Sequence, residues 1–146
     1  MRPRWLVLAA TLVLCGSLSF GVQQEEGQEE DAKDFQSEGD YRKGMQDIDH
    51  SFGDLLEERE RFWLEPDTQR NAARLTDLFH RVETFWKGRG DEEAAGFARL
   101  AREGAERAQE ASRMRDEKAF DAAVDSIASS CAGCHAEASE KFRLRP

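Results

Sequence analysis

Apolar side chains recur at helical spacing in four successive stretches of the chain, and this feature constrains the fold more than any other. In the first stretch they advance by three or four residues: Tyr41, Met45, Ile48, Phe52 and Leu55. Such steps place side chains on one face of an α-helix, whereas a half-buried strand shows strict alternation. No alternation of useful length occurs, and the β-branched residues that favour strands are few. The sequence therefore predicts an all-α protein.

The later stretches begin and end at residues that favour helix termini. Pro66 precedes the second stretch, and Gly88 and Gly90 follow it, since proline suits the first turn of a helix and glycine suits its end. Acidic residues 91–93 open the third stretch, where carboxylates suit the helix dipole. The fourth stretch begins near Asp116. Four helices of about 20 residues with short connections predict an antiparallel up-down-up-down four-helix bundle.

Each of these three helices has a predicted apolar face. The faces are Leu75, Leu78, Phe79, Val82, Phe85 and Trp86 in the second stretch, Phe97, Leu100, Ala101, Gly104, Ala108, Ala111 and Met114 in the third, and Phe120, Val124, Ile127, Cys131, His135, Ala138 and Phe142 in the fourth. The third is the weakest, being rich in alanine and interrupted by Gly96 and Gly104. Small residues there allow close approach of a neighbouring helix or of a flat ligand.

Charge divides the chain into three regions. Residues 1–21 predict a cleaved signal peptide, because Arg2 and Arg4 precede an uncharged apolar run that ends among small residues. An uncleaved anchor is the alternative, although the run is short against the roughly 20 residues that span a bilayer. Lipidation of Cys15 is disfavoured by the bulky Leu14 before it. Residues 22–38, with Phe35 as their only large apolar side chain, predict an acidic disordered linker, and residues 39–146 form the folded domain.

Location and partners follow in part from this division. Export implies a periplasmic domain with no stable membrane insertion once the signal is cleaved. The formal net charge of −9 leaves no basic surplus to neutralise phosphates, so no nucleic-acid partner is expected.

One motif carries recognisable chemistry. Cys131-Ala132-Gly133-Cys134-His135 has the C-x-x-C-H pattern of c-type haem attachment, in which two thiols form thioethers with the porphyrin and the histidine binds iron. A thioredoxin-like redox pair would need a βαβ context that the sequence lacks. Half of a zinc site and a structural disulfide are further alternatives, but the first needs more ligands and the second leaves the histidine unexplained. The motif occurs once and predicts one covalent haem c.

The position of the motif limits the second iron ligand. Eleven residues follow His135, and none is Met or His. A second axial ligand must therefore come from an earlier helix. Neither a Ser-His-Asp set nor a phosphate-binding loop is present, so we expect no enzyme.

A C-x-x-C-H motif near the end of the last helix of a bundle resembles the cytochrome c-prime family and its six-coordinate, low-spin relatives. The first helix adds to the resemblance through Tyr41-Arg42-Lys43-Gly44-Met45 and the following stretch at residues 50–53, which is similar to that family's opening helix. The chain departs from the family in the spacing before Met45 and in the residues just after the haem histidine.

The resemblance implies a distal position for Met45. Ligation by Met45 and His135 would make a carrier of single electrons, with redox proteins as partners and a homodimer as a further expectation. Packing of Met45 without ligation would leave a five-coordinate iron that binds nitric oxide or carbon monoxide. His50 is predicted to face solvent or a helix interface, and His80 is disfavoured as a ligand.

Overall fold

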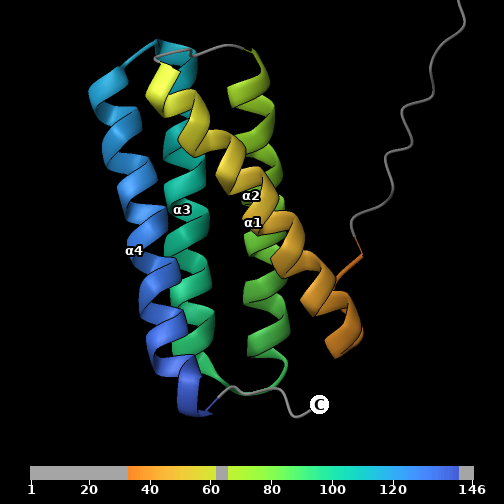
Figure 1. Cartoon of the computed structure of the whole chain (residues 1–146). Coiled ribbons are helices and arrows are strands. Elements are labelled where there is room, and N and C mark those ends of the chain that lie inside the picture. Colours follow the sequence, from red (N-terminus) through yellow and green to blue (C-terminus); the bar gives the residue numbers. More distant parts are fainter. Residues whose placement is uncertain (1–32, 62–65, 142–146) are drawn as a thin grey trace, which may run out of the picture.

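The computed structural model describes residues 33–61 and 66–141, and these form helices without any strand. In this part of the chain the helices are α1 (Glu38–Arg61), α2 (Pro66–Lys87), α3 (Glu92–Met114) and α4 (Glu117–Lys141). Successive helices run in opposite directions (Figure 1). The prediction of an all-α fold with four helices is confirmed for the described residues.

The helices do not contribute equally to the bundle. α3 packs along both α2 and α4, whereas α1 packs mainly on α2 and makes few contacts with α4. Figure 1 shows α1 inclined across the bundle, close to α4 at its C-terminal end and away from α4 at its N-terminal end. The bundle is therefore a tight α2–α3–α4 core with a first helix that diverges from the fourth.

Polar side chains cap the starts of α1 and α3, and the sequence predicted the start of α3 at residues 91–93. Ser37 and Asp40 form a reciprocal cap at the start of α1, because the Asp40 amide donates to Ser37 Oγ and the Ser37 amide donates to Asp40 Oδ2. Asp91 caps α3 by accepting from the Ala94 amide at 2.9 Å. Arg115 ends α3 in the left-handed region, with φ of 56°.

Alanine and glycine allow α3 to lie close to its neighbours. The buried alanines of α3 carry no side chain beyond Cβ, so the backbones of adjacent helices approach one another. At Gly104 a Cβ would lie 2.8 Å from Ile127 Cγ1 and 3.3 Å from the Ile127 backbone nitrogen. The small residues of the third stretch thus fit α4 against α3, one of the two uses that the sequence suggested.

The predicted apolar face of α3 is wrong at Leu100, which is 48% exposed. Met114, at the very end of this helix, is 64% exposed. Glu93, Leu100, Arg107 and Met114 follow one another at intervals of seven residues, which return to nearly the same side of a helix, and that side faces solvent. Leu100 is excluded from the core because α2 and α4 cover the alanine-rich side of α3.

The N-terminal end of the described chain differs from the expectation of a disordered linker. Phe35 lies within residues 22–38, the predicted linker, yet it is only 7% exposed and belongs to the hydrophobic core. Its ring lies against α1 at Gly44, where a Cβ would approach within 2.1 Å of Phe35 Cζ. A single aromatic ring that fits a glycine gap is buried despite the polar sequence around it.

Several predictions concern residues outside the described ranges. These are the signal peptide at residues 1–21, the lipidation alternative at Cys15, and Phe142 on the apolar face of the fourth helix. Of the helices described, none has the combination of length and apolar character that a membrane crossing requires.

Candidate functional site

A hollow lies where side chains from all four helices meet. It contains about 330 Å³ of empty space, including space open to solvent. Its lining residues are Tyr41 and Met45 of α1, Phe79 and Val82 of α2, Phe97, Ala98 and Ala101 of α3, and Ser130, Cys131, Cys134 and His135 of α4. Nearly all of this lining is apolar. The Ser130 hydroxyl already donates a hydrogen bond to the backbone oxygen of Ser126, at 2.9 Å, and so adds little polarity to the hollow.

The four residues singled out from the sequence come together at this hollow. Cys131, Cys134 and His135 line one side from α4, and Met45 lines it from α1. Cys131 and Cys134 are three residues apart, so they project from one face of the helix. Met45 is far from them in sequence, and the tertiary structure alone brings its thioether to the same space.

Both cysteines of the motif are free thiols and half-buried. Burial, with a smaller contribution from the neighbouring Cys134, raises the pKa of Cys131 to about 11. Burial also raises the pKa of Cys134, with a smaller contribution from Asp91. Both thiols therefore lie in an apolar environment that favours their protonated form.

The divergence of α1 from α4 places the hollow at the seam between these helices. Tyr41, Met45 and Phe52 of α1 and Cys131 of α4 pack against the core yet are only partly buried. Apolar side chains left partly exposed on facing elements leave room for another apolar group. A porphyrin is larger than the hollow, so it would occupy the seam as well.

The residues present fit a covalently held haem. The lining is apolar and aromatic, two thiols lie on one helix face, and an imidazole follows the second thiol directly. His135 lines the hollow and is exposed to solvent. Because α1 makes few contacts with α4, a haem in the seam would leave the packing of α2, α3 and α4 on one another in place.

Sequence reasoning missed part of this lining. Phe79 and Val82 were assigned to an apolar face, but nothing in their spacing shows which of that face's residues meet a cavity. Tyr41 was assigned to the apolar stripe of the first helix and to the family resemblance, but neither indicated that it meets a cavity. Of the aromatic residues on the predicted apolar faces of the third and fourth helices, Phe97 lines the hollow, whereas Phe120 is fully buried in the core.

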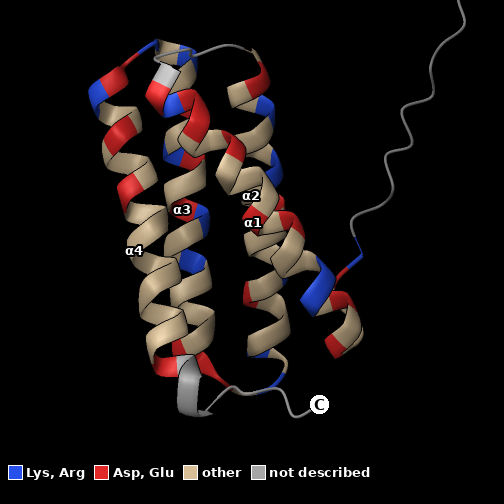
Figure 2. Ribbon diagram, in the orientation of Figure 1, with Lys and Arg blue, Asp and Glu red and all other residues tan. Residues whose placement is uncertain are grey.

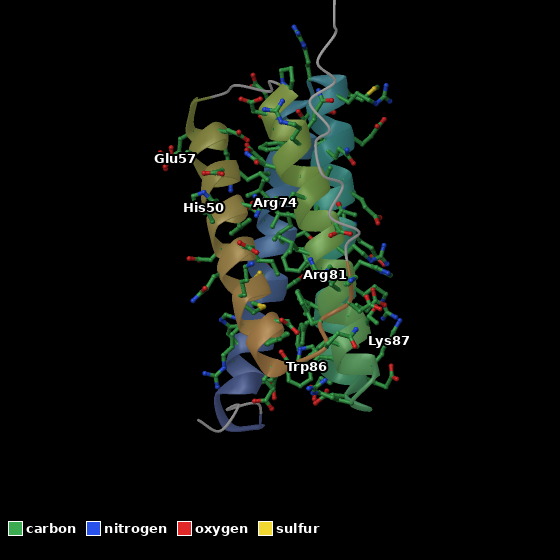
Figure 3. The ribbon with its side chains drawn as sticks, turned by 90° about the vertical axis from the view of Figure 1, so that its right-hand side faces the viewer. His50, Glu57, Arg74, Arg81, Trp86 and Lys87 are labelled. Atoms are coloured by element: carbon green, nitrogen blue, oxygen red, sulfur yellow. The ribbon has the colours of Figure 1, made fainter. Side chains whose placement is uncertain are left out.

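The remaining histidines are not part of the site. His50 and His80 are exposed, and Figure 3 shows His50 on the outer side of α1. Within residues 33–61 and 66–141, no group of three or more His, Cys, Asp or Glu side chains is arranged to hold a metal ion. A haem iron does not need such a group, because the porphyrin supplies its equatorial ligands.

Charge is excluded from the helix around the motif. Residues 126–136 of α4 contain no Asp, Glu, Lys or Arg, and Figure 2 shows a long tan stretch in the lower half of α4. An uncharged helix segment lowers the local polarity on the side of the hollow that carries the thiols.

Comparison with protein-family models, with curated proteins and with solved structures found no match to the chain. The resemblance to the cytochrome c-prime family accordingly stays a prediction from the motif and the opening helix. What can be said of function is argued from the residues of the hollow.

Proposed function

We propose that the protein is an exported monohaem c-type cytochrome that carries single electrons. One observation carries the proposal: Met45 and the three chemically distinctive residues of the C-x-x-C-H motif line one apolar hollow, although they belong to the first and last helices. Cys131 and Cys134 would hold the haem through thioethers, and His135 and Met45 would be the axial ligands. When bound, the haem supplies an iron that accepts and releases one electron.

The protein side of the site suits electron transfer. Thioether and imidazole form the usual axial pair of electron carriers, and the thioether raises the reduction potential. The apolar lining acts in the same direction, since a medium of low polarity disfavours the more highly charged ferric state. The rigid α2–α3–α4 core limits rearrangement of the residues around the iron when its charge changes.

The family resemblance supports the same reading. The motif lies near the end of α4, and the Tyr41–Met45 segment that resembles the opening helix of the cytochrome c-prime family lies in α1. In the five-coordinate alternative, Met45 packs over the iron without ligating it, and the protein binds nitric oxide or carbon monoxide. The two functions differ in the coordination number of the iron.

The test is the absorption spectrum of protein matured in a host with cytochrome c assembly machinery. We expect covalent haem, a low-spin ferric spectrum and a sulfur-to-iron charge-transfer band. Met45→Ala should abolish the band. Met114→Ala is the matched control, because Met114 is exposed at the end of α3 and should leave the band unchanged.

Two outcomes would contradict parts of the proposal. A high-spin spectrum in the unmodified protein would refute Met45 ligation and favour the gas-binding alternative. A Cys131→Ser, Cys134→Ser double variant that keeps its haem on a denaturing gel would refute the attachment. A colourless preparation of the unmodified protein would refute the cytochrome assignment altogether.

A further inference from the structure

α1 contacts the rest of the bundle at both ends and between them. Near its C-terminal end, Arg59 contacts α4 through Asp121 at 3.0 Å and Asp125 at 2.8 Å. Near its N-terminal end it contacts α2 instead, through the side chain of Tyr41, and between these places Asp47 pairs with Arg74 of α2 at 3.5 Å. Met45 lies in the N-terminal half of α1, which diverges from α4 (Figure 1). The N-terminal fastening, one helical turn from Met45, therefore contributes to how far Met45 stands from the motif on α4.

That fastening is built from four rings, which we call the aromatic anchor: Phe35, Tyr41, Phe85 and Trp86. The Tyr41 ring is stacked on Phe85, with centroids 4.5 Å apart and an interplanar angle of 15°. Trp86 meets Tyr41 edge-on at 5.5 Å. The Trp86 indole also donates a hydrogen bond to the Tyr41 hydroxyl at 3.3 Å. Figure 3 shows Trp86 at the end of α2, beside the start of α1.

Phe35 completes the aromatic anchor from the segment before α1. Its ring lies edge-on to both Tyr41 and Phe85, at centroid distances of 6.0 and 6.4 Å. The guanidinium of Arg81 lies 4.4 Å from the centre of the Phe35 ring. Because the ring also fills the gap at Gly44, Phe35 blocks movement of α1 along α2.

Tyr41 and Met45 are one helical turn apart, and both line the hollow. A shift of the Tyr41 ring within the anchor is therefore transmitted to Met45 through the helix backbone. We propose that the aromatic anchor positions Met45 at the iron and so sets the balance between six-coordinate and five-coordinate haem. This inference rests on the proposed function, and it makes the anchor residues positioning residues that act through Met45.

Carbon monoxide reports this balance, because it binds ferrous iron only where Met45 has left. The apparent affinity for carbon monoxide is thus reduced by the fraction of molecules in which Met45 is bound. Loosening the anchor lowers that fraction and strengthens carbon monoxide binding. A residue that only stabilises the fold would not have this effect.

The first experiment removes one hydrogen bond and leaves the rings in place. Tyr41→Phe keeps the stacking on Phe85, and Trp86→Phe keeps an aromatic edge without the indole donor. We expect each variant to bind carbon monoxide about fivefold more tightly in the ferrous state, the factor for a hydrogen bond of average strength. The double variant should exceed each single variant only slightly, because both changes remove the same bond.

The second experiment uses a matched pair of core substitutions. Phe35→Ala removes the ring behind Tyr41, and Phe120→Ala removes a buried ring of α4. Both destabilise the fold, but Phe120 is not part of the anchor. We expect Phe35→Ala to weaken the sulfur-to-iron band and strengthen carbon monoxide binding by about tenfold or more, and Phe120→Ala to leave both close to the unmodified protein.

The outcomes separate this inference from the proposed function. A low-spin unmodified protein whose carbon monoxide affinity is unchanged in Tyr41→Phe, Trp86→Phe and Phe35→Ala would overturn the anchor and leave the electron carrier standing. Equal effects of Phe35→Ala and Phe120→Ala would also overturn the anchor, since they would reflect general destabilisation. A five-coordinate unmodified protein would overturn both the Met45 ligation and its positioning.

Discussion

Alanine substitutions at two glycines of α3 should change stability in opposite directions. Gly96 and Gly104 both lie inside the helix, so replacement by alanine brings the same gain in helix propensity at each. Their surroundings differ. A Cβ at Gly96 meets no atom within 4 Å, whereas a Cβ at Gly104 would lie 2.8 Å from Ile127 Cγ1. The same Cβ would also lie 3.4 Å from the backbone oxygen of Ala123, an atom that cannot rotate away.

The magnitudes follow from these distances. Alanine is favoured over glycine inside a helix by about 1 kcal/mol, so Gly96→Ala should raise the free energy of unfolding by about that amount. Overpacking a tight interface costs about 1–3 kcal/mol. The cost at position 104 lies towards the upper end, because backbone atoms of α4 must move. Gly104→Ala should therefore lower the free energy of unfolding by about 1–2 kcal/mol after the propensity gain is subtracted.

Urea denaturation followed by far-ultraviolet circular dichroism measures both variants at equal haem content. The dependence of the free energy on urea should be the same for all three proteins, since neither substitution changes the surface exposed on unfolding. Equal stabilisation by Gly96→Ala and Gly104→Ala would refute the close approach of α3 and α4 at Gly104.

Two further substitutions test the electrostatics of the bundle. Burial acts to raise the pKa of Glu83, but hydrogen bonds and charge from Lys87 and Arg102 outweigh it and hold the pKa below its ordinary value of 4.5. The contribution of Glu83 to stability is thus fully present above pH 4.5 and is lost as the pH falls through the lowered pKa; Glu83→Gln should flatten this acid dependence in denaturation curves measured from pH 7 to pH 3. Asp91→Ala should lower the free energy of unfolding by about 1 kcal/mol, since the Ala94 amide loses its cap, and Asp91→Asn should restore most of it. Equal stabilities of Asp91→Ala and Asp91→Asn would show that the cap contributes nothing.

Much of the fold follows from local signals in the sequence. The stripe from Tyr41 to Leu55 predicts α1. Pro66 is the first residue of α2, and Asp91 directly precedes α3. These signals succeed because helix periodicity and capping depend on residues within about one turn of each other. The alanine-rich third stretch also indicated close packing, which Gly104 illustrates.

Predictions that depend on distant contacts were less successful. Phe35 looks like part of a polar linker until the gap at Gly44 and the rings of α2 are in place. Leu100 has the spacing of a core residue, but the positions of α2 and α4 leave it in solvent. Neither outcome can be read from the residues on either side.

The candidate site shows the same division. The C-x-x-C-H pattern is a local signal, because two thiols and an imidazole on one turn suffice to suggest haem attachment. Its partner residue on α1 was suggested by resemblance alone, since helical spacing does not show which of several apolar residues faces another helix. The aromatic anchor had no signal at all, because its members come from three separate segments.

By itself, the sequence determined that this chain forms helices and near which residues most of them begin, and it predicts that a five-residue segment binds a cofactor. The tertiary structure decided that α1 diverges from α4, that Met45 shares an apolar hollow with Cys131, Cys134 and His135, and that Phe35 is buried. The physical reason is range. Helix formation and capping act between neighbours along the chain, whereas the width of a seam depends on contacts between side chains that only folding brings together.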